Sequence, residues 1–371
     1  MQLIYLAPLA WESFAQRPHM FVRWFHEKHQ AKVLWINPYP TRFLQWQDLR
    51  RLAAAPDACA TVTPDWLTVV SPNSLPLEPL AAGQWLNRQL WRHLLERARA
   101  FAQAAETVLA IGKPSALATA LLGKLPHCCS LLDLMDDYPQ FYRGWSQVAL
   151  RKCELNLVNR VSVLLVSSTG LKDKWSTLRP DLQLVRNGVA PELFLPLKQP
   201  RHRNTRPVFG YVGTLAHWFD WPWVAHLART FPHATVRLIG PLFGRLPADL
   251  PDNVEVLPAC DHASAIAAMQ EFDVGLIPFR LTQLTAAVDP IKFYEYRALG
   301  LAVVSTPFGE MTRHASERGV FLSRLTGDIA GQMKYALDFT DEPHAQAQFI
   351  AENTWTVRFE RFALTAIQRK T

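Results

Sequence analysis

Short, almost continuous apolar runs alternate with amphipathic stretches along this chain, and that alternation limits the possible folds more than any other feature. The runs at 3–9, 107–112 and 161–167 are apolar at nearly every position, so both faces of the strands that they predict must be buried. Stretches of helical periodicity, such as 17–30 and 146–159, lie between them. Strands buried on both faces and separated by helices indicate parallel β-sheet with helices on both sides. We therefore predict an α/β fold.

One segment interrupts this alternation. Residues 196–207 (PLKQPRHRNTRP) are polar, basic and proline-containing, which is typical of a linker, and the pattern restarts after them. A chain of 371 residues, of which 49% are hydrophobic, can form two cores. We predict two Rossmann-like domains facing a cleft, over residues 1–190 and 191–354, with the C-terminal helix 355–371 packed back on the first domain. Ligands of such folds bind beyond the carboxyl ends of the strands.

The cysteines and the N-terminus bear on the cellular compartment. Cysteines stand at positions 59, 128, 129, 153 and 260. Their odd number and the lack of CxxC spacing exclude a disulfide framework and a zinc site, so we predict reduced thiols. The N-terminus has no basic region before its apolar run, and no stretch reaches the roughly 18 apolar residues of a membrane helix. We predict a cytoplasmic protein that is at most peripheral at the inner face of the cytoplasmic membrane.

The net charge of +7 lies entirely in the first half of the chain. Residues 1–190 carry 21 Lys and Arg against 14 Asp and Glu, whereas residues 191–371 carry 18 of each. A basic excess favours nucleic acid, an anionic membrane surface or an acidic substrate, or it serves solubility alone. No nucleic-acid-binding motif accompanies the charge, so we predict no nucleic-acid partner.

Part of this charge falls on one predicted helix, over residues 84–104. Arg88, Arg92 and Arg99 recur there at spacings of four and seven, so they share a face. Leu90, Trp91 and Leu94 lie beside them. A basic face next to apolar residues suits an anionic membrane surface, and the alternative is a solvated basic face.

The segment 273–306 (DVGLIPFRLTQLTAAVDPIKFYEYRALGLAVVST) carries the most chemical information. A strand runs into a loop, Asp289 and Pro290 open a helix, and Lys292 and Glu295 share a face of it. Free N–H groups, the helix dipole and a lysine together favour a phosphate at such a helix start. A carboxylate one turn further in can accept the two hydroxyls of a ribose. The alternative is a surface ion pair with no ligand.

This segment resembles the donor-binding motif of GT-B glycosyltransferases, especially bacterial exopolysaccharide and teichuronic-acid-type enzymes of the family 4 and family 1-like groups. The matching residues are Asp273, Pro278, Phe279, Pro290, Lys292, Glu295, Tyr296, Ala298, Gly300, Val303, Val304, Ser305 and Thr306. The resemblance implies that Lys292 contacts the diphosphate and Glu295 the ribose of a nucleotide-diphosphate sugar. It also implies that the protein needs neither a metal ion nor a bound cofactor.

Other stretches look like the same family. Residues 210–221 (GYVGTLAHWFDW) resemble the first strand and loop of the C-terminal domain, which implies that Gly213 and Thr214 approach the donor. Residues 166–189 look like the crossing between the domains, and we expect Arg186 from this stretch to contact the donor as well. In the same loop as Gly213, Trp218 and Phe219 are either core residues or stack on a sugar or base.

The chain also departs from the family pattern. The two glutamates of the E-x7-E pattern would fall on positions 287 and 295, but position 287 is an alanine. The usual Arg and Lys of the first C-domain loop are missing, which leaves His217 or a distal arginine to replace them. Retention and inversion of the sugar's configuration therefore both stay open.

Two further segments supply candidates for the catalytic base. QRPHM (16–20) and LLDLMDDYPQF (131–141) resemble N-terminal-domain segments of the same family, and they contain His19, Asp133, Asp136 and Asp137. Transfer of a sugar needs a group that takes the proton of the acceptor hydroxyl, and a carboxylate among like charges has a raised pKa that suits this task. We expect Asp136 or Asp137 to be this base, with His19 as the next candidate. The alternative for all of them is helix capping.

Together these features predict a glycosyltransferase that moves a sugar from a nucleotide-diphosphate sugar to a saccharide or lipid-linked acceptor in polysaccharide biosynthesis. We keep two alternatives. One is a UDP-sugar epimerase of the same fold, and the other is a two-lobed binding protein without catalysis. The sugar, the base and the acceptor stay open at this point.

Overall fold

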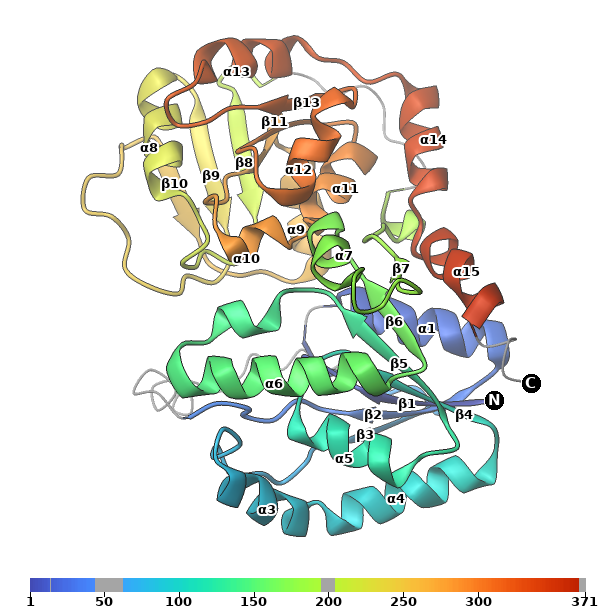
Figure 1. Ribbon diagram of the computed structural model, residues 1–371. Coiled ribbons are helices and arrows are strands. Elements are labelled where there is room, and N and C mark those ends of the chain that lie inside the picture. Colours follow the sequence, from blue (N-terminus) through green and yellow to red (C-terminus); the bar gives the residue numbers. More distant parts are fainter. Residues whose placement is uncertain (14, 44–62, 195–203, 367–371) are drawn as a thin grey trace. The chain divides into compact units, whose positions relative to one another are not determined.

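The computed structural model describes residues 1–13, 15–43, 63–194 and 204–366. The chain divides into two compact units (Figure 1). The first comprises Met1–Ser167, Leu171–Val185 and Phe359–Thr371, and the second comprises Ser168–Gly170 and Arg186–Arg358. The boundaries thus follow residues 185 and 358, where we expected them after 190 and 354.

The main crossing lies upstream of the expected linker. Asn187 and Val189 already belong to the second unit, because the N–H of Asn187 donates to Asp289 over 2.6 Å and that of Val189 donates to Asn353 O over 2.9 Å. The segment 196–207 therefore does not separate the units, and its residues 196–203 lie outside the described part of the chain. The crossing falls instead within the stretch 166–189, as the family resemblance implied.

The first unit contains a seven-stranded parallel sheet in the order β3-β2-β1-β4-β5-β6-β7. Its strands are β1 (Gln2–Leu6), β2 (Lys32–Ile36), β3 (Leu67–Val70), β4 (Thr107–Ile111), β5 (Cys129–Leu134), β6 (Val163–Val166) and β7 (Gln183–Leu184). Every residue of β1, β4 and β6 is buried, as the uniformly apolar runs predicted. The chain builds outward from β1 in one direction and then from β4 in the other, so the sheet changes direction between these two central strands.

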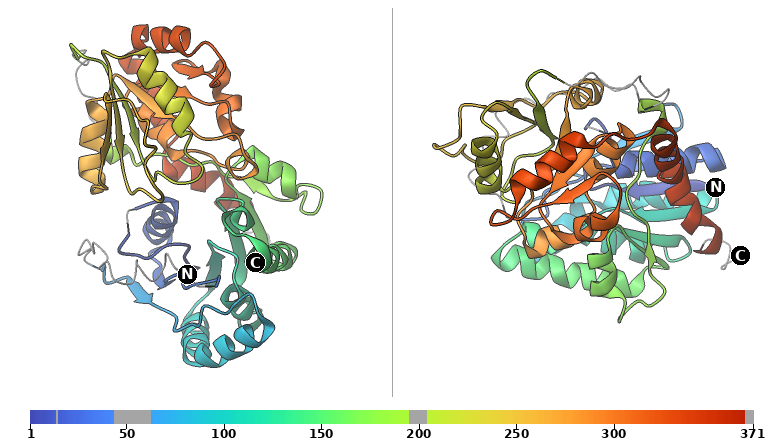
Figure 2. Two further views of the ribbon diagram at one scale, coloured as in Figure 1. Left: turned by 90° about the vertical axis from the view of Figure 1, so that its left-hand side faces the viewer. Right: turned by 90° about the horizontal axis from the view of Figure 1, so that it is seen from above.

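Helices cover both faces of this sheet (Figures 1 and 2). They are α1 (Arg17–His29), α3 (Ala81–Leu90), α4 (Arg92–Ala104), α5 (Ala116–Lys124), α6 (Gly144–Arg160), α7 (Thr169–Trp175) and α15 (Trp355–Ala366), with a 3-10 turn η1 at Tyr138–Phe141. The C-terminal part of α15 packs on α1, where the ring of Phe21 lies 5.2 Å from that of Phe359. Helices α3, α4 and α5 lie on the opposite face.

The long helix expected over 84–104 is broken. Helix α3 ends at Leu90 and α4 begins at Arg92. Trp91, between them, is fully buried, and its Nε1–H donates to Ser74 Oγ over 2.8 Å. Leu94 is buried as well. Trp91 and Leu94 therefore do not belong to an exposed apolar face, contrary to our expectation.

The second unit contains a six-stranded parallel sheet in the order β10-β9-β8-β11-β12-β13. Its strands are β8 (Val208–Val212), β9 (Thr235–Ile239), β10 (Val254–Leu257), β11 (Val274–Ile277), β12 (Ala302–Ser305) and β13 (Val320–Leu322). Its helices are α8 (Trp221–Thr230), α9 (His262–Gln270), α10 (Gln283–Ala286), α11 (Ile291–Ala298), α12 (Gly309–Arg313), α13 (Ile329–Asp338) and α14 (Pro343–Glu352), with 3-10 turns η2 (Pro191–Leu193) and η3 (His314–Ser316). This sheet changes direction between β8 and β11.

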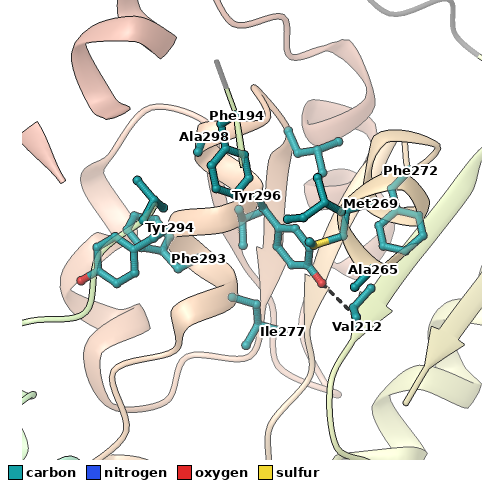
Figure 3. Close-up of a cluster of buried hydrophobic side chains, with 14 of the residues drawn as sticks. Phe194, Val212, Ala265, Met269, Phe272, Ile277, Phe293, Tyr294, Tyr296 and Ala298 are labelled. Carbon is teal, nitrogen blue, oxygen red and sulfur yellow. Dashed lines mark hydrogen bonds between the residues drawn. The ribbon is translucent and has the colours of Figure 1, made fainter. Parts of the chain in front are cut away.

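Tyr296 of helix α11 lies among the buried side chains of the second unit (Figure 3). Tyr296 is fully buried, and its hydroxyl accepts the N–H of Val212 at the end of β8 over 3.2 Å. A Cβ at Gly275 in β11 would lie 2.4 Å from the Tyr296 ring, so only glycine allows this approach. The tyrosine thereby fixes α11 over the point where the sheet changes direction.

Within the described residues, no helix is long and apolar enough to cross a membrane. The structure describes four of the five cysteines, Cys128, Cys129, Cys153 and Cys260, and all four are free thiols.

Candidate functional site

The start of α11 is held by a buried network in the second unit. Asp289 accepts the hydroxyl of Tyr294 over 3.0 Å and the N–H of Asn187 over 2.6 Å. Burial raises the pKa of Asp289 to about 6. Pro290 then precedes the first helical residue, where its fixed φ suits a helix entry. These contacts hold the N-terminal turn of α11 in one place.

Lys292 and Glu295 form an ion pair on this helix. Glu295 is 4% exposed, and its Oε1 lies 3.7 Å from His262 Nε2. Burial acts to raise the pKa of Glu295, but the charges and hydrogen bonds of Lys292 and His262 outweigh it and hold the pKa below its usual value. Glu295 is therefore an ionised carboxylate at neutral pH, and an ionised carboxylate only accepts hydrogen bonds.

His262 is a site residue that our sequence analysis missed. It is the first residue of α9, whose start is capped by Asp261 through the N–H of Ser264 over 2.8 Å. The available signal was the sequence DHAS after a predicted strand, since Asp followed by a helix marks a capped start beyond a carboxyl end. Its proximity to Glu295 depends on how α9 and α11 pack.

Gly213 stands at the carboxyl end of β8, next to the change of direction of the sheet. Its φ of +155° favours glycine, and a Cβ there would lie 2.6 Å from the Tyr211 hydroxyl. That hydroxyl donates to the carbonyl oxygen of the partly exposed Thr214 over 3.2 Å. A Cβ at the neighbouring Gly240 would lie 2.1 Å from the carbonyl oxygen of Gly213. The sheet edge here presents backbone rather than side chains, which permits close approach by a ligand.

The aromatic residues of the same loop have different roles. Phe219 is 2% exposed, and its ring packs 5.1 Å from Tyr211 and 4.7 Å from Trp221. It is a core residue, which is one of the two alternatives that we kept for it, and it does not stack on a sugar or base. Trp218 is partly exposed, and its ring lies 5.0 Å from that of the exposed His217. These two rings are accessible to a ligand.

Neither Arg186 nor Ala287 offers an unpaired charged group to a ligand near α11. Arg186 pairs with the buried Glu310 over 3.0 Å, and Glu310 also accepts the N–H of Thr169. Arg186 therefore already neutralises a buried carboxylate, and its expected contact with the donor stays a prediction. Ala287, at the position of the first glutamate of the E-x7-E pattern, is 6% exposed.

In the first unit, the three aspartates near the end of β5 differ in their hydrogen bonds and ion pairs. Asp133 makes a two-pronged contact with Arg17 over 2.8 and 2.9 Å, and Asp137 pairs with Lys174 over 2.9 Å. Asp136 is partly buried and has no hydrogen bond or ion pair with any residue in the described part of the chain. Burial, and then the charge of Asp137, raise the pKa of Asp136 to about 6. Of the three carboxylates, only Asp136 is available and has a pKa near neutrality.

His19 has the structure of a helix cap. It is 2% exposed, its Nδ1 accepts the N–H of Gln16 over 3.1 Å, and its Nε2 lies 3.0 Å from Trp11 O. Gln16 and His19 form a reciprocal capping box at the start of α1. Burial lowers the pKa of His19 to about 4. Because both ring nitrogens are engaged, the structure does not support His19 as a base.

No group of three or more His, Cys, Asp or Glu side chains in the described ranges could hold a metal ion. Asp133 and Asp137 pair with different cations, Arg17 and Lys174, so the three aspartates do not form a shared ligand set.

The comparison with known sequences gives one partial match. No protein-family profile matches the chain. A protein of Bacillus subtilis (strain 168), whose assignment as the teichuronic acid biosynthesis glycosyltransferase TuaH is itself provisional, is 29% identical over 173 residues. The match covers 42% of this chain and 43% of that relative, so less than half of the relative's length is represented.

Solved structures match over nearly the whole chain. The Anabaena protein Alr3699/HepE in complex with UDP has a TM-score of 0.61 and 14% identity, and the match covers 98% of this chain and 99% of that one. The E. coli structure described as trehalose-6-phosphate bound with UDP-2-fluoro glucose has a TM-score of 0.62 and 12% identity, with 98% of each chain covered. Both have two Rossmann-like domains, the arrangement called GT-B, and the chain shares this fold.

The unpaired state of Asp136 generates a prediction about stability. A carboxyl whose folded pKa lies near 6, against about 3.9 unfolded, loses stabilisation as pH rises through that interval, because the folded state holds the proton more tightly. Asp136→Asn removes this penalty, so we expect it to raise the free energy of unfolding by up to about 3 kcal/mol at pH 7.5 and hardly at all at pH 4. Urea unfolding at both pH values measures the difference.

Asp133→Asn is the matched control. It leaves the buried Arg17 without its carboxylate, so we expect it to destabilise the protein at pH 7.5 by about 3 to 5 kcal/mol. If Asp136→Asn were as destabilising as Asp133→Asn, Asp136 would have a structural partner and our interpretation of it would be wrong.

Proposed function

Starting from the GT-B fold of this chain, we propose that it is a glycosyltransferase that moves a sugar from a nucleotide-diphosphate sugar to a saccharide acceptor in polysaccharide biosynthesis. The observation that carries the proposal is the buried, ionised Glu295 beside Lys292 on α11. The pair lies at a helix start next to the point where the parallel sheet changes direction, and ligands of such sheets bind at this point. Recognition of a ribose and a diphosphate explains such a pair.

The two side chains have complementary tasks in this proposal. Lys292 and the N-terminal dipole of α11 bind the diphosphate and stabilise the charge that develops on it as it leaves. Glu295 accepts hydrogen bonds from the ribose hydroxyls. The two residues pair with each other, and donor binding would exchange this ion pair for contacts with the donor. Gly213 and Thr214 supply the bare sheet edge along which the donor lies.

The base for the reaction is Asp136 of the first unit. The acceptor hydroxyl attacks C1 of the donor sugar, the bond from C1 to the phosphate oxygen breaks, the nucleoside diphosphate leaves, and the hydroxyl proton passes to the Asp136 carboxylate. A pKa of about 6 keeps this carboxylate ionised at pH 7 yet basic enough to take a proton. We propose that neither a metal ion nor a cofactor takes part.

Relatives support the donor class. HepE was solved with UDP, and with UDP and glucose, and the E. coli structure with UDP-2-fluoro glucose. We therefore propose a UDP-sugar as donor. The partial match to a teichuronic acid biosynthesis glycosyltransferase supports a saccharide acceptor from polysaccharide synthesis. We propose that this acceptor can be lipid-linked.

We also propose contact with an anionic membrane surface through α3. Trp85 is 61% exposed, Leu86 40% and Leu90 47%. Arg88 and the adjoining Arg92 are exposed on the flank of this apolar surface. Aromatic and aliphatic side chains beside arginines are the composition of an interfacial helix, and each arginine near anionic lipid contributes about 1 kcal/mol. Contact of this kind would place the protein at the inner face of the cytoplasmic membrane.

The first prediction of this proposal concerns the donor. Lys292→Ala should weaken UDP binding by about 10- to 100-fold, because a charge-assisted contact is lost. Glu295→Gln should weaken UDP but leave inorganic pyrophosphate almost unchanged, because only the ribose contact depends on the carboxylate. Isothermal titration calorimetry measures both. Lys334→Ala, an exposed lysine of α13, is the control. Unchanged binding of UDP and GDP by both site variants would contradict the assignment of α11.

The second prediction concerns the reaction itself. Asp136→Asn should lower turnover by about 10²- to 10⁴-fold and leave UDP affinity unchanged. In the wild-type protein, turnover should fall as pH drops through about 6, because the base becomes protonated. Acceptor-dependent release of UDP measures turnover and also excludes a pure binding protein. Exchange of deuterium at C2 of the sugar without an acceptor would favour the epimerase instead.

The third prediction concerns the membrane. The protein should co-sediment with phosphatidylglycerol vesicles at low salt and should not bind neutral vesicles. At 1 M salt, where the screening length is about 3 Å, it should dissociate from the anionic vesicles. Trp85→Ser with Arg88→Gln should reduce the binding strongly. Tyr335→Ser with Lys334→Gln, an exposed pair on α13 of the second unit, should not. Binding that is indifferent to salt, or equal loss in both double variants, would refute the role of α3.

A further inference from the structure

Lys113 occupies a distinctive position in the first unit. It follows β4 by two residues, beside the point where the sheet changes direction between β1 and β4. In open α/β sheets this is the place where ligands bind. The preceding Gly112 packs so closely on the segment after β1 that a Cβ would lie 2.8 Å from Pro8 Cδ. The first polar side chain that β4 presents at this edge is therefore that of Lys113.

Lys113 forms no ion pair in the described part of the chain, although its charge acts to lower the pKa of the buried Glu78. It is partly buried, and its Nζ lies 5.7 Å from the centre of the Tyr142 ring. The Tyr142 hydroxyl lies 3.3 Å from Thr41 Oγ1, and Arg42 follows in the chain. A partly buried ammonium group without a carboxylate costs free energy that an anionic ligand would recover.

Tyr142 reports the charge of its surroundings. Burial acts to raise its pKa, but the charge of Lys113, hydrogen bonds to Thr41 and Lys113 and the charge of Arg42 outweigh burial, so the pKa of Tyr142 is lowered. A phenol whose ionised form is favoured lies in a positive potential. Two cations and one hydroxyl thus converge here from the segments after β2, β4 and η1.

The charge of Lys113 acts on one buried carboxyl group, that of Glu78. Glu78 is 5% exposed, and its Oε1 accepts the N–H of Ala116 at the start of α5 over 2.8 Å. The next N–H groups of α5 are also satisfied, that of Leu117 by the Tyr39 hydroxyl and that of Ala118 by Ser115 Oγ. The helix start is therefore not itself the anion site.

We propose that Lys113, Tyr142 and Arg42 form a subsite for a carboxylate or phosphate group on the acceptor sugar. The inference rests on the proposed transferase function and adds the chemical class of its acceptor, which would be an acidic or phosphorylated saccharide. Asp136 follows β5, the strand next to β4, by two residues, so the proton-accepting group belongs to the same edge of the same sheet. The subsite would hold the acidic group of the acceptor while Asp136 receives the proton of its hydroxyl.

Binding to the full chain, with excess UDP to occupy the donor site, tests this proposal. The probes are glucuronate, inorganic phosphate and glucose, measured by isothermal titration calorimetry. At least one anion should bind more tightly than glucose, and the stronger of the two identifies a carboxylate or a phosphate as the recognised group. Lys113→Met should weaken that anion by about 10- to 100-fold, the effect of one charge-assisted hydrogen bond. Lys113→Arg should restore most of the affinity.

Two further variants keep the test decisive. Lys124→Met removes an α5 lysine that pairs with the exposed Glu96, and it should change nothing. Tyr142→Phe should cause a smaller loss than Lys113→Met. Equal anion affinity in the wild type and Lys113→Met, or glucose binding as tightly as both anions, would overturn the subsite. Such a failure would leave the UDP binding of the donor site intact, whereas failure of the proposed function would abolish UDP binding and turnover but not the dependence of the anion on Lys113.

Discussion

The parallel direction of every strand pair is the constraint on which this structure depends. In a parallel sheet each strand must be followed by a crossover to the start of the next strand. The carboxyl ends of the strands therefore all lie at one edge of the sheet and the amino ends at the opposite edge. In both units the candidate functional residues follow the carboxyl end of a strand: Lys113 follows β4, Asp136 follows β5 and Gly213 follows β8. Each of them lies on or next to a strand that borders the change of direction of its sheet.

Buried ion pairs then decide which of these groups remain available. Asp133 is neutralised by Arg17, 116 residues away in the sequence, and Glu310 by Arg186, 124 residues away. Lys174 joins Asp137 on one side to the fully buried Glu154 on the other. Because a buried charge without a partner is costly, such pairs are strongly maintained once formed. Asp136 belongs to none of these pairs. No cation therefore offsets burial and the charge of Asp137, which raise its pKa.

The donor helix combines local and non-local design. Lys292 and Glu295 are neighbours because they are one turn apart, so their pairing follows from the helix itself. The burial of Glu295 and its second partner, His262, depend on the packing of α9 against the sheet beside α11. Burial turns a surface pair of small energetic value into a site with a fixed charge. The same packing places Tyr296 against Gly275 and holds the helix start steady.

The amino-acid pattern alone was enough to predict the class of fold and most of its elements. β4, β6 and α1 lie within the stretches 107–112, 161–167 and 17–30 that predicted them, because burial of both faces of a strand, or of one face of a helix, determines the pattern of the element's own residues. Short elements such as β13 and the apolar α5 show no such pattern, since they have too few residues for a periodicity. The break at Trp91, the capping role of His19, the burial of Phe219 and the isolation of Asp136 appear only in the folded chain. Each of them depends on atoms contributed by distant segments, and no local pattern records which of several similar side chains will find a partner there.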